Sequence, residues 1–492
     1  MTTLAATARL RTGFPVLVWA LGLAALMRLV TLGLYPLTDT TEARYAEIAR
    51  KMVELGDWVT PWYDYGVPFW AKPPLSTWMT AISFKLLGVN EFAARLPYFL
   101  AAIFIAWLVW DWMRQHSARG ALLATTLLSG TALYFVAAGA VMTDMALLAG
   151  TMLAMRGFWL GLYGDEPQRR RERWLLFVGL AIGLLAKGPI AVVLAALPVA
   201  LWAATTGNIG SAWRALPWLR GGVLMFALAA PWYLLAEQHT PGFLNYFLIG
   251  EHWYRFTVPG WSGDRYGVAH AVPRGTIWLY ALGACAPWTF LLPFAAIGRR
   301  SVETPVAPPE ERARDRYLLC WGLAPCVFFT ASSNIIWTYA LPGLPALAML
   351  AAGWLGRDPR HRRVDSLVAA GLLFLAVSFG GMLITEQLTG AFKSAKAVVA
   401  AYETRKSGNA ALLFVGGHRY SPAFYSRGKA EQLIDVPALA ERMRREGAVG
   451  GGSSEVFIAL RDRQDRELPS ELRERVKFQG RFGHYELFSM RQ

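Results

Sequence analysis

The sequence is poor in cysteine, in charged residues and, most of all, in lysine. Its three cysteines, Cys285, Cys320 and Cys326, all lie in apolar runs. An odd number of cysteines in such positions argues against a disulfide framework and against a cysteine-based metal site. Charged residues make up only 17% of the 492 residues, hydrophobic residues make up 55%, and the mean hydropathy is +0.32. This balance excludes an ordinary soluble protein and predicts a polytopic membrane protein.

Lysine is scarce, and arginine supplies most of the positive charge. The chain has 9 lysines and 40 arginines, and Lys187 is the only lysine between Leu86 and Gly390. A net charge of +15 could indicate a nucleic-acid-binding protein, but the arginines cluster in short loops between apolar runs and not along one soluble face. We therefore attribute the charge to membrane topology and expect no nucleic-acid partner.

Three arginine-rich loops determine the expected topology. The loops "DEPQRRRERW", "GRRSVETPVAPPEERARDR" and "GRDPRHRR" carry 13 arginines, whereas "VAAGAVMTD" and "TASSNIIWTY" carry none. By the positive-inside rule, the first three face the cytoplasm and the other two face outside. Apolar runs of about 18 residues can cross a hydrocarbon core of about 30 Å as helices. Eleven spans are expected, near residues 14–35, 92–110, 120–138, 142–161, 174–187, 189–205, 220–237, 274–296, 316–331, 338–355 and 366–385.

An odd number of spans places the two ends of the chain on opposite faces of the membrane, so everything after Thr385 is expected outside. The first apolar run is too long for a signal-peptide core, so it is expected to stay as a membrane anchor with the N-terminus inside. Residues 1–385 form the predicted membrane domain, and its first external loop covers 36–91. Residues 386–492 contain strand-like segments and one helical segment, which predicts a small external α/β domain capping the site.

The first external loop is expected to contain amphipathic helices. In "TEARYAEIARKMVEL" the apolar residues fall broadly on one helical side and the charged residues surround the rest. This pattern predicts an interfacial helix on the membrane surface. The segment "STWMTAISFKLLG" resembles a second amphipathic or re-entrant piece.

Two carboxylates, Asp39 and Asp144, lie at helix ends that are expected to be external. Asp39 precedes the helix expected from about Thr41, so it can serve as a helix N-cap, but it can equally serve as a catalytic carboxylate. Asp144 in "VMTDMALLAG" lies at another external helix end. Two acids on one face of a membrane favour a functional site.

Isolated cations lie on the same external face. Lys187 in "LLAKGPIAVV" is a lone ionisable group between apolar runs, which marks a functional candidate, with snorkelling to the headgroups as the alternative. Lys72 in "FWAKPPL" is held beside two prolines. In "GEHWYRF", Arg255 suits a phosphate contact, whereas His252 lacks a second histidine at metal-binding spacing. The anion expected at a membrane surface is a lipid phosphate.

The motifs together resemble a known group of enzymes. "DTTEARYAEIARKM", "GDWVTPW", "KPPL", "MTDMALL", "LLAKGP", "EHWYRF" and "TYALPGLPALAML" occur in the order found in GT-C glycosyltransferases of the protein O-mannosyltransferase and aminoarabinose (lipid A) transferase type. The resemblance covers about the first 350 residues, and the "SPAFYSRGK" segment resembles the external C-terminal domain of that family. It implies a polytopic α-helical GT-C fold and an inverting transferase that uses a polyprenyl-phosphate-linked sugar as donor.

The resemblance also implies residue roles. Asp39 would act on the acceptor, Asp144 would be the acid opening the fourth span, and Lys72 would hold the carrier phosphate. The remaining matching positions extend the donor phosphate-binding set to Lys187, Arg255, Tyr339, Arg44 and Tyr45, with Glu42 and His252 as further candidates. The acceptor would be lipid A, another glycan or a protein, at the outer face of a bacterial inner membrane.

Two departures separate this chain from the aminoarabinose transferases. Ala71 stands where they have a glutamate before the lysine, which disfavours a divalent metal shared with His252, and no cofactor is assigned. "SSNIIWTY" replaces "KGKLPTY" and so loses two lysines, which indicates a different substrate. A lipid or solute transporter is the main alternative, although no internal repeat is visible. A noncatalytic assembly subunit is the third hypothesis.

Overall fold

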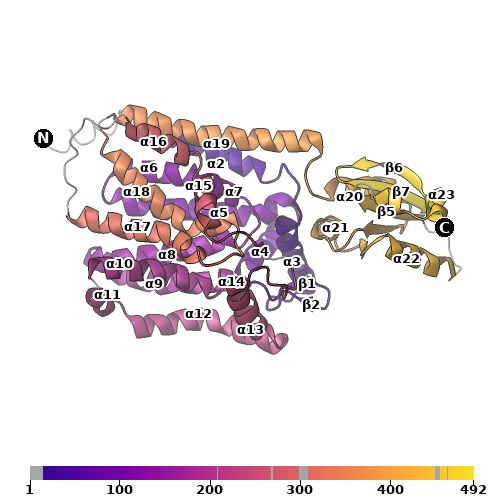
Figure 1. Cartoon of the computed structure of the whole chain (residues 1–492), viewed down its shortest axis with the longest axis horizontal. Helices are drawn as coiled ribbons and strands as arrows, with labels where there is room; N and C mark the ends of the chain where they lie inside the picture. The colour runs from indigo at the N-terminus through magenta and orange to yellow at the C-terminus, as the bar shows by residue number, and fades with distance from the viewer. Residues whose placement is uncertain are drawn as a thin grey trace. The chain divides into compact units, whose positions relative to one another are not determined.

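The computed structural model describes residues 15–207, 209–267, 270–297, 309–358, 360–448, 455–461 and 464–491. The chain divides into two compact units (Figure 1). Unit 1 comprises residues 1–31, 57–79 and 95–378, and unit 2 comprises residues 32–56, 80–94 and 379–492. Unit 2 thus combines parts of the predicted first external loop with the C-terminal part of the chain, and each unit is described separately below.

Helices dominate unit 1. In chain order they are α2 (Pro15–Thr31), α5 (Glu91–Arg114), α6 (Ala118–Ser129), α7 (Ala132–Ala137), α8 (Asp144–Tyr163), α9 (Glu166–Lys187), α10 (Ile190–Thr206), α11 (Ile209–Ala215), α12 (Trp218–His239), α13 (Phe243–Asn245), the π-helix η1 (Tyr246–Tyr254), α14 (Arg255–Thr257), α15 (Thr276–Ala284), α16 (Trp288–Ile297), α17 (Pro309–Phe329), the 3-10 helix η2 (Trp337–Gly343), α18 (Leu344–Gly356) and α19 (His361–Thr389). A short hairpin of β1 (Trp62–Asp64) and β2 (Val67–Pro68) precedes α4 (Leu75–Leu87). Helices α4, α5 and α19 each contribute residues to both units.

Every predicted span coincides with helical structure, so the predicted helical membrane fold is confirmed. Two spans are broken: the run 120–138 divides into α6 and α7, and the run 274–296 divides into α15 and α16 before Pro287. Five described helices are long and apolar enough to cross a membrane: Glu91–Arg114, Asp144–Tyr163, Trp218–His239, Trp337–Gly356 and His361–Thr389. The count of eleven crossings stays a prediction, and residues 298–308 of one arginine-rich loop lie outside the described residues.

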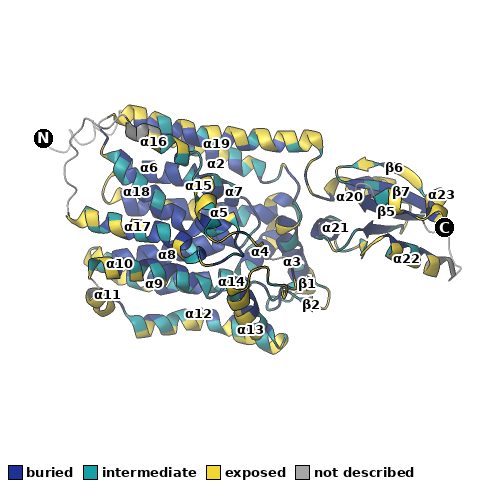
Figure 2. Ribbon diagram, in the orientation of Figure 1, coloured by how far each residue is buried: buried dark blue, intermediate teal, exposed yellow. Residues whose placement is uncertain are grey.

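Helices α8 and α9 form a hairpin whose backbones touch. A Cβ atom added at Gly157 would lie 2.5 Å from the backbone nitrogen of Leu176, and one added at Gly179 would lie 2.5 Å from that of Ala154. Glycine therefore permits the close approach that small residues give at membrane helix interfaces. Helix α8 is buried along nearly its whole length (Figure 2).

The hairpin is also held together by buried charge near its connecting loop. Arg156 of α8 pairs with Asp111 of α5 at 2.6 Å and with Glu172 of α9 at 3.0 Å. The Arg156 side chain is only 3% exposed and that of Glu172 is fully buried. Removing one partner from such a pair would leave an uncompensated buried charge, so the network fixes the relative position of these three helices.

Unit 2 contains a five-stranded mixed sheet in the order β4-β3-β5-β7-β6 (Figure 1). Its strands are β3 (Ala411–Val415), β4 (Glu431–Leu433), β5 (Glu455–Arg461), β6 (Lys477–Phe482) and β7 (Tyr485–Arg491). Its helices are α20 (Lys396–Arg405), α21 (Tyr420–Tyr425), α22 (Val436–Ala448) and α23 (Ser470–Arg475). One apolar layer packs with α20 and the other with α22 and α23. The predicted α/β character of the C-terminal part is confirmed, whereas α20 and α21 were not predicted.

Helix α3 (Thr41–Leu55) confirms the predicted helix, but its polar face is not solvated. Glu47 and Lys51 are each 1% exposed and Arg50 is 6% exposed, because α3 is covered on most sides and packs on α21 within unit 2. Burial raises the pKa of the Glu47 carboxyl even though Arg50 and Lys51 oppose the rise. The charged face of α3 is therefore packed against protein within unit 2, and the position of this helix on the membrane surface stays a prediction.

We expect the glycine contacts of the α8–α9 hairpin to set the stability of unit 1. Gly157→Ala should lower the free energy of unfolding by about 1–3 kcal/mol, because the new methyl group overpacks a backbone contact. Gly222→Ala in α12 is the matched control, since a Cβ there meets nothing within 4 Å. It should be neutral or slightly stabilising. Melting curves of the detergent-solubilised variants measure both, and equal melting temperatures would contradict the role of the contact.

Candidate functional site

The open end of the α8–α9 hairpin brings Asp144 and Lys187 together. Asp144 is the first residue of α8 and Lys187 is the last residue of α9. The Lys187 Nζ lies 2.7 Å from an Asp144 carboxylate oxygen and 4.9 Å from the centre of the Tyr339 ring. The two charged side chains are 13% and 9% exposed, so they are largely shielded from water. Three predicted site residues thus form one ion-pair and cation–π group.

Gly188 follows Lys187 directly and ends α9. Its φ of 84° is a left-handed conformation that ends α9, and a Cβ there would lie 2.5 Å from the Phe247 ring. His252 closes the same corner: its Nδ1 lies 2.8 Å from the Phe247 carbonyl oxygen and its Nε2 lies 3.2 Å from that of Lys187. Burial lowers the pKa of His252, although these carbonyl contacts oppose the shift.

The surroundings of His252 and Lys72 do not suit a divalent metal. Both ring nitrogens of His252 face carbonyl oxygens, so neither is directed at a metal position. Ala71 supplies no carboxylate before Lys72. Within the described ranges, no group of three histidine, cysteine, aspartate or glutamate side chains is arranged to hold a metal ion. His252 instead packs against the Phe247 ring and ties η1 to the end of α9.

Lys72 and Arg255 share the carboxylate of Glu251. The Lys72 Nζ lies 3.1 Å from Glu251 Oε2, and an Arg255 guanidinium nitrogen lies 3.1 Å from the same oxygen. Arg255 also pairs with Asp264 at 3.0 Å. The Glu251 side chain is 1% exposed, whereas those of Lys72 and Arg255 are 20% and 22% exposed. The cations therefore face accessible space and the carboxylate lies behind them.

Charge compensation keeps Glu251 ionised. Burial alone would raise the pKa of this carboxyl, but Lys72 and Arg255 outweigh burial and hold the pKa below its ordinary value. The hydroxyl of Tyr246 donates a third contact to Glu251 at 3.2 Å. Tyr246 and Glu251 are five residues apart in a π-helix, where that spacing aligns side chains that an α-helix would separate.

Asp39, Arg44 and Tyr45 belong to unit 2. The Asp39 Oδ1 accepts the backbone N–H groups of Tyr420 and Ser421, each at 3.0 Å, and its Oδ2 accepts the Ser421 hydroxyl. The Arg44 guanidinium lies over the rings of Tyr45 and Tyr420, at 5.3 and 5.8 Å. Glu42, the remaining candidate, is 8% exposed.

The interpretation of Asp39 as the cap of its own helix is wrong. Helix α3 begins after Thr40, whose side chain makes no capping hydrogen bond. The Asp39 carboxylate instead satisfies N–H groups in the first turn of α21, which no intrahelical carbonyl can reach. Asp39 is thus a capping carboxylate, but the helix that it caps lies about 380 residues further along the chain.

Sequence reasoning missed the carboxylates that organise the cations. Glu251 lies within "GEHWYRF", but no motif in the sequence marks Glu251, Asp264, Tyr246 or Arg265 as a site residue. The available signal was that Glu251 and Asp264 stand four residues before and nine residues after Arg255, since a partly buried cation needs a partner. No pattern in the sequence indicates that residues 246–254 form a π-helix.

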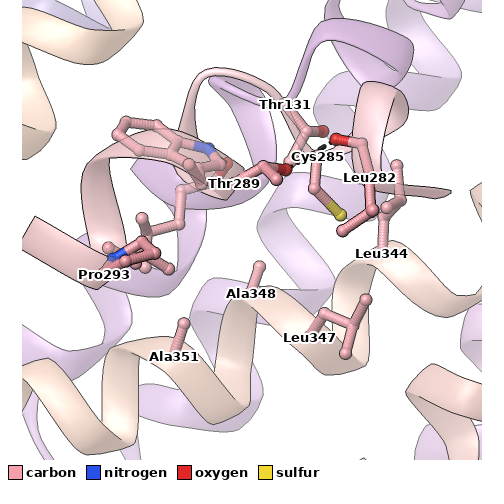
Figure 3. A pocket seen from close by; sticks show the side chains of 12 residues that line it. Thr131, Leu282, Cys285, Thr289, Pro293, Leu344, Leu347, Ala348 and Ala351 are labelled. Atoms are coloured by element: carbon pink, nitrogen blue, oxygen red, sulfur yellow. Dashed lines mark hydrogen bonds between the residues drawn. The ribbon is translucent and has the colours of Figure 1, made fainter. Parts of the chain in front are cut away.

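An apolar cavity of about 260 Å³ lies between α6, α15, α16 and α18 (Figure 3). Its polar atoms are largely satisfied within the protein: the Thr131 hydroxyl donates to Leu128, the Thr289 hydroxyl donates to Leu282, and the Trp288 indole donates to Leu127. The cavity therefore suits a hydrocarbon group. It is lined by Leu127, Thr131, Leu282, Cys285, Trp288, Thr289, Leu292, Pro293, Leu344, Leu347, Ala348 and Ala351.

Comparisons with known proteins agree with this geometry. Residues 10–247 match the family described as dolichyl-phosphate-mannose-protein mannosyltransferase. The undecaprenyl phosphate-alpha-4-amino-4-deoxy-L-arabinose arabinosyl transferase of Erwinia tasmaniensis is 31% identical over 343 residues, which is 67% of this chain and 57% of that protein. The transferase of the same name from Aeromonas salmonicida is 32% identical over 355 residues, which is 68% of this chain and 59% of that protein. This chain thus spans less than two thirds of the length of these relatives.

Two solved structures share the whole fold. The crystal structure of ArnT from Cupriavidus metallidurans bound to undecaprenyl phosphate superposes with a TM-score of 0.77 at 20% identity and covers 96% of this chain and 97% of that one. The apo structure of the same protein gives a TM-score of 0.75 at 20% identity and covers 99% of this chain and 98% of that one. With the five apolar helices, these matches identify a multi-pass protein of the bacterial inner membrane.

The charge cluster predicts a pH-dependent stability difference. Glu251→Gln should lower the free energy of unfolding by about 1.5–3 kcal/mol at pH 7, because Lys72 and Arg255 lose their hydrogen bonds to a shared carboxylate. A carboxyl whose folded pKa is depressed stabilises above its unfolded pKa of about 4.3 and loses that contribution as the pH falls through the folded value. The difference in the free energy of unfolding between Glu251→Gln and wild type should therefore become smaller below about pH 4.

Melting temperatures measured from pH 7 down to the lowest pH that the detergent allows test this expectation. Glu471→Gln is the control, because Glu471 is an exposed carboxylate of α23. A gap between Glu251→Gln and wild type that stays constant down to the lowest pH would show that the charge of Glu251 is not the cause.

Proposed function

This chain is a GT-C fold protein of the aminoarabinose transferase type, and from that premise we propose that it is an inverting glycosyltransferase of the cell envelope. It transfers a sugar from a polyprenyl-phosphate carrier to an envelope acceptor on the outer face of the inner membrane. The observation that carries the proposal is the pair of accessible cations, Lys72 and Arg255, held on one buried carboxylate. The curated relatives named above are transferases of an undecaprenyl phosphate-linked sugar, which is consistent with this donor class.

Lys72 and Arg255 are proposed to bind the phosphate that leaves with the polyprenyl carrier. As the bond between the anomeric carbon and the phosphate oxygen breaks, negative charge builds up on that oxygen. Preorganised cations stabilise this charge without having to reorient during the reaction. Glu251 holds both cations in place beforehand, so a phosphate oxygen can share them with the carboxylate.

The isoprenoid chain of the donor is proposed to occupy the apolar cavity. Tyr339 and Leu344 are five residues apart on the continuous segment from η2 into α18, and Leu344 already lines the cavity. At about 2 Å per residue in a 3-10 helix, five residues separate the Tyr339 backbone from this wall of the cavity by roughly 10 Å. A phosphate near Lys187 and a hydrocarbon chain in the cavity would therefore suit one amphipathic ligand.

Lys187, Asp144 and Asp39 complete the proposed mechanism. Lys187 adds positive charge to the donor side, and Asp144 fixes its ammonium group by the 2.7 Å contact. Asp39 is proposed to orient the acceptor and, for a hydroxyl acceptor, to take its proton. A single displacement at the anomeric carbon then inverts its configuration, and the polyprenyl phosphate departs with the bonding electrons.

The direct test is sugar transfer by the purified protein in lipid nanodiscs. Synthetic undecaprenyl-phosphate sugars and lipid A are supplied, and mass spectrometry follows the product. Transfer of any sugar supports the proposal, and envelope lipids from a deletion strain identify the missing modification. A protein that moves the intact lipid across vesicles without cleaving the sugar–phosphate bond would be a transporter and not a transferase.

Topology offers an independent prediction. The proposed orientation places the C-terminal sheet outside, so an introduced Ser407→Cys in a variant without the native cysteines should react with a membrane-impermeant maleimide in intact spheroplasts. Arg170→Cys, in an arginine-rich loop assigned to the cytoplasm, should react only after lysis. The reverse labelling pattern would overturn the orientation.

Both site lysines should be needed for the chemical step. Lys72→Ala and Lys187→Ala should each lower kcat by about 100- to 1,000-fold, which is the loss expected when one oxyanion-stabilising donor is removed. Lys429→Ala, at an exposed lysine of unit 2, is the control for handling and expression. Because Lys187→Ala leaves Asp144 without its cation, the double variant Lys187→Met with Asp144→Asn separates folding from catalysis. Folded variants with wild-type rates would remove the lysines from the mechanism.

The role of Asp39 can be tested without disturbing its contacts. In Asp39→Asn, the amide oxygen can still accept the two N–H groups of α21, and the amide nitrogen can donate to Ser421. We expect normal folding and donor binding but a transfer rate reduced by about 100-fold or more, as for loss of a general base. A rate within a few-fold of wild type would leave Asp39 with only its structural role in holding α21.

A further inference from the structure

Arg265 is an arginine that neither the sequence motifs nor the proposed mechanism uses. Its guanidinium lies 4.9 Å from the centre of the Trp70 ring and 5.2 Å from that of Tyr246. The two rings are 6.0 Å apart, so the guanidinium lies over both. The residue as a whole is exposed. Stacking on two aromatic faces restricts a side chain that would otherwise move freely at the surface.

The aromatic platform is itself fixed. The Trp70 indole donates to the Thr240 hydroxyl at 3.0 Å, and its backbone N–H donates to the Tyr266 hydroxyl at 3.1 Å. The Tyr246 hydroxyl accepts the backbone N–H of Arg265 at 3.2 Å. Arg265 is therefore held at both ends, through its backbone and through its guanidinium plane.

Arg265 belongs to the same cluster as the donor cations. Tyr246 links it to Glu251, because the hydroxyl that accepts from Arg265 also donates to that carboxylate. Asp264 is its neighbour in sequence and pairs with Arg255. Trp70, which carries the guanidinium, lies two residues before Lys72. Three connections thus tie Arg265 to the group around Glu251.

Charge balance separates Arg265 from its neighbours. Lys72 and Arg255 are matched by the carboxylates of Glu251 and Asp264. Arg265 forms no ion pair with a carboxylate in the described part of the chain, and its contacts there are the two rings. The cluster of five charged groups therefore keeps one positive charge that the protein does not neutralise. An uncompensated, oriented cation next to a donor site favours an anionic ligand group.

We propose that Arg265 is a further phosphoryl-binding residue of this site. The inference rests on the proposed function, since it adds a contact to the same substrate-binding region. Two phosphoryl groups have the required chemistry: the phosphodiester of the donor and a phosphate carried by the acceptor. Stacking occupies the faces of the guanidinium and leaves its N–H edge for phosphate oxygens, which it can contact in a bidentate manner.

A lysine in place of Arg265 would bind a phosphoryl group less tightly. An ammonium group keeps the charge, but it lacks the planar fork that binds two phosphate oxygens. A glutamine keeps a planar end group without the charge. The pair of variants Arg265→Lys and Arg265→Gln therefore separates the contribution of charge from that of geometry. Arg274→Gln is the matched control, because Arg274 is another exposed arginine of the same loop region.

The experiment is two-substrate steady-state kinetics of the full-length protein in nanodiscs. Arg265→Gln should raise the KM of one substrate by about tenfold, with kcat within about twofold of wild type, because a hydrogen bond to a charged group is lost. The KM of Arg265→Lys should lie between those of wild type and Arg265→Gln. The rise in KM should be smaller at high salt, because exposed charges are screened. A raised donor KM assigns the donor phosphodiester, and a raised acceptor KM assigns the acceptor phosphate.

Several results would overturn the inference. Both KM values within twofold of wild type, or an equal rise in Arg274→Gln, would show that Arg265 binds no phosphoryl group. A fall in kcat alone would likewise refute a binding role. If wild-type protein transfers no sugar, the proposed function fails, and binding of undecaprenyl phosphate in nanodiscs still tests Arg265. Weaker binding by Arg265→Gln than by wild type and Arg274→Gln supports the inference, and equal binding refutes it.

Discussion

The constraint on which the described site depends is that a cation shielded from water needs a carboxylate beside it. Lys187 stands at the end of a helix that is apolar along its second half, and Asp144 compensates it at 2.7 Å. This contact exists only because α8 and α9 run antiparallel at backbone contact, with glycines at their interface. The buried Arg156 network near the connecting loop fixes the same hairpin at its other end. The geometry of the Lys187–Asp144 pair therefore depends on how helices α8 and α9 pack.

The same rule governs Lys72 and Arg255, with a different consequence. Their carboxylate partner is almost fully buried, whereas the cations are about one-fifth exposed. The protein thus compensates the charge from behind and leaves the front of each cation accessible. A ligand phosphate then meets groups that are already oriented, so little reorganisation is required when charge develops on the leaving oxygen. The backbone carbonyl of Ala71 also accepts a hydrogen bond from the Lys72 ammonium at 2.7 Å, which adds a second fixed contact to this cation.

The helices and the isolated site lysines could be predicted from the sequence, because long apolar runs and rare charges are strong local signals. Lys187 is conspicuous as the one lysine in some 300 residues, and the helices follow directly from apolar runs. The partners could not be predicted in the same way. Glu251 reaches Tyr246 only through a π-helix, and Asp39 caps a helix that begins at Tyr420. The polar face of α3 has the same sequence pattern whether water or α21 covers it. Its burial can therefore be recognised only from the tertiary structure.

The Asp39 carboxylate is fixed by a helix that lies far from it in the sequence. Its three contacts fall on two consecutive residues of α21, and the hydroxyl of Tyr425, at the end of that helix, accepts the backbone N–H of Leu37 and donates to Glu91. Residues 32–56 and 80–94 therefore belong to one unit with the C-terminal sheet, and the short helix α21 contacts both of these segments within that unit. A carboxylate held by two N–H groups and a hydroxyl is oriented within a narrow range. That orientation suits a group that positions an acceptor, and since a carboxylate has about four lone-pair sites, one site remains that can take a proton.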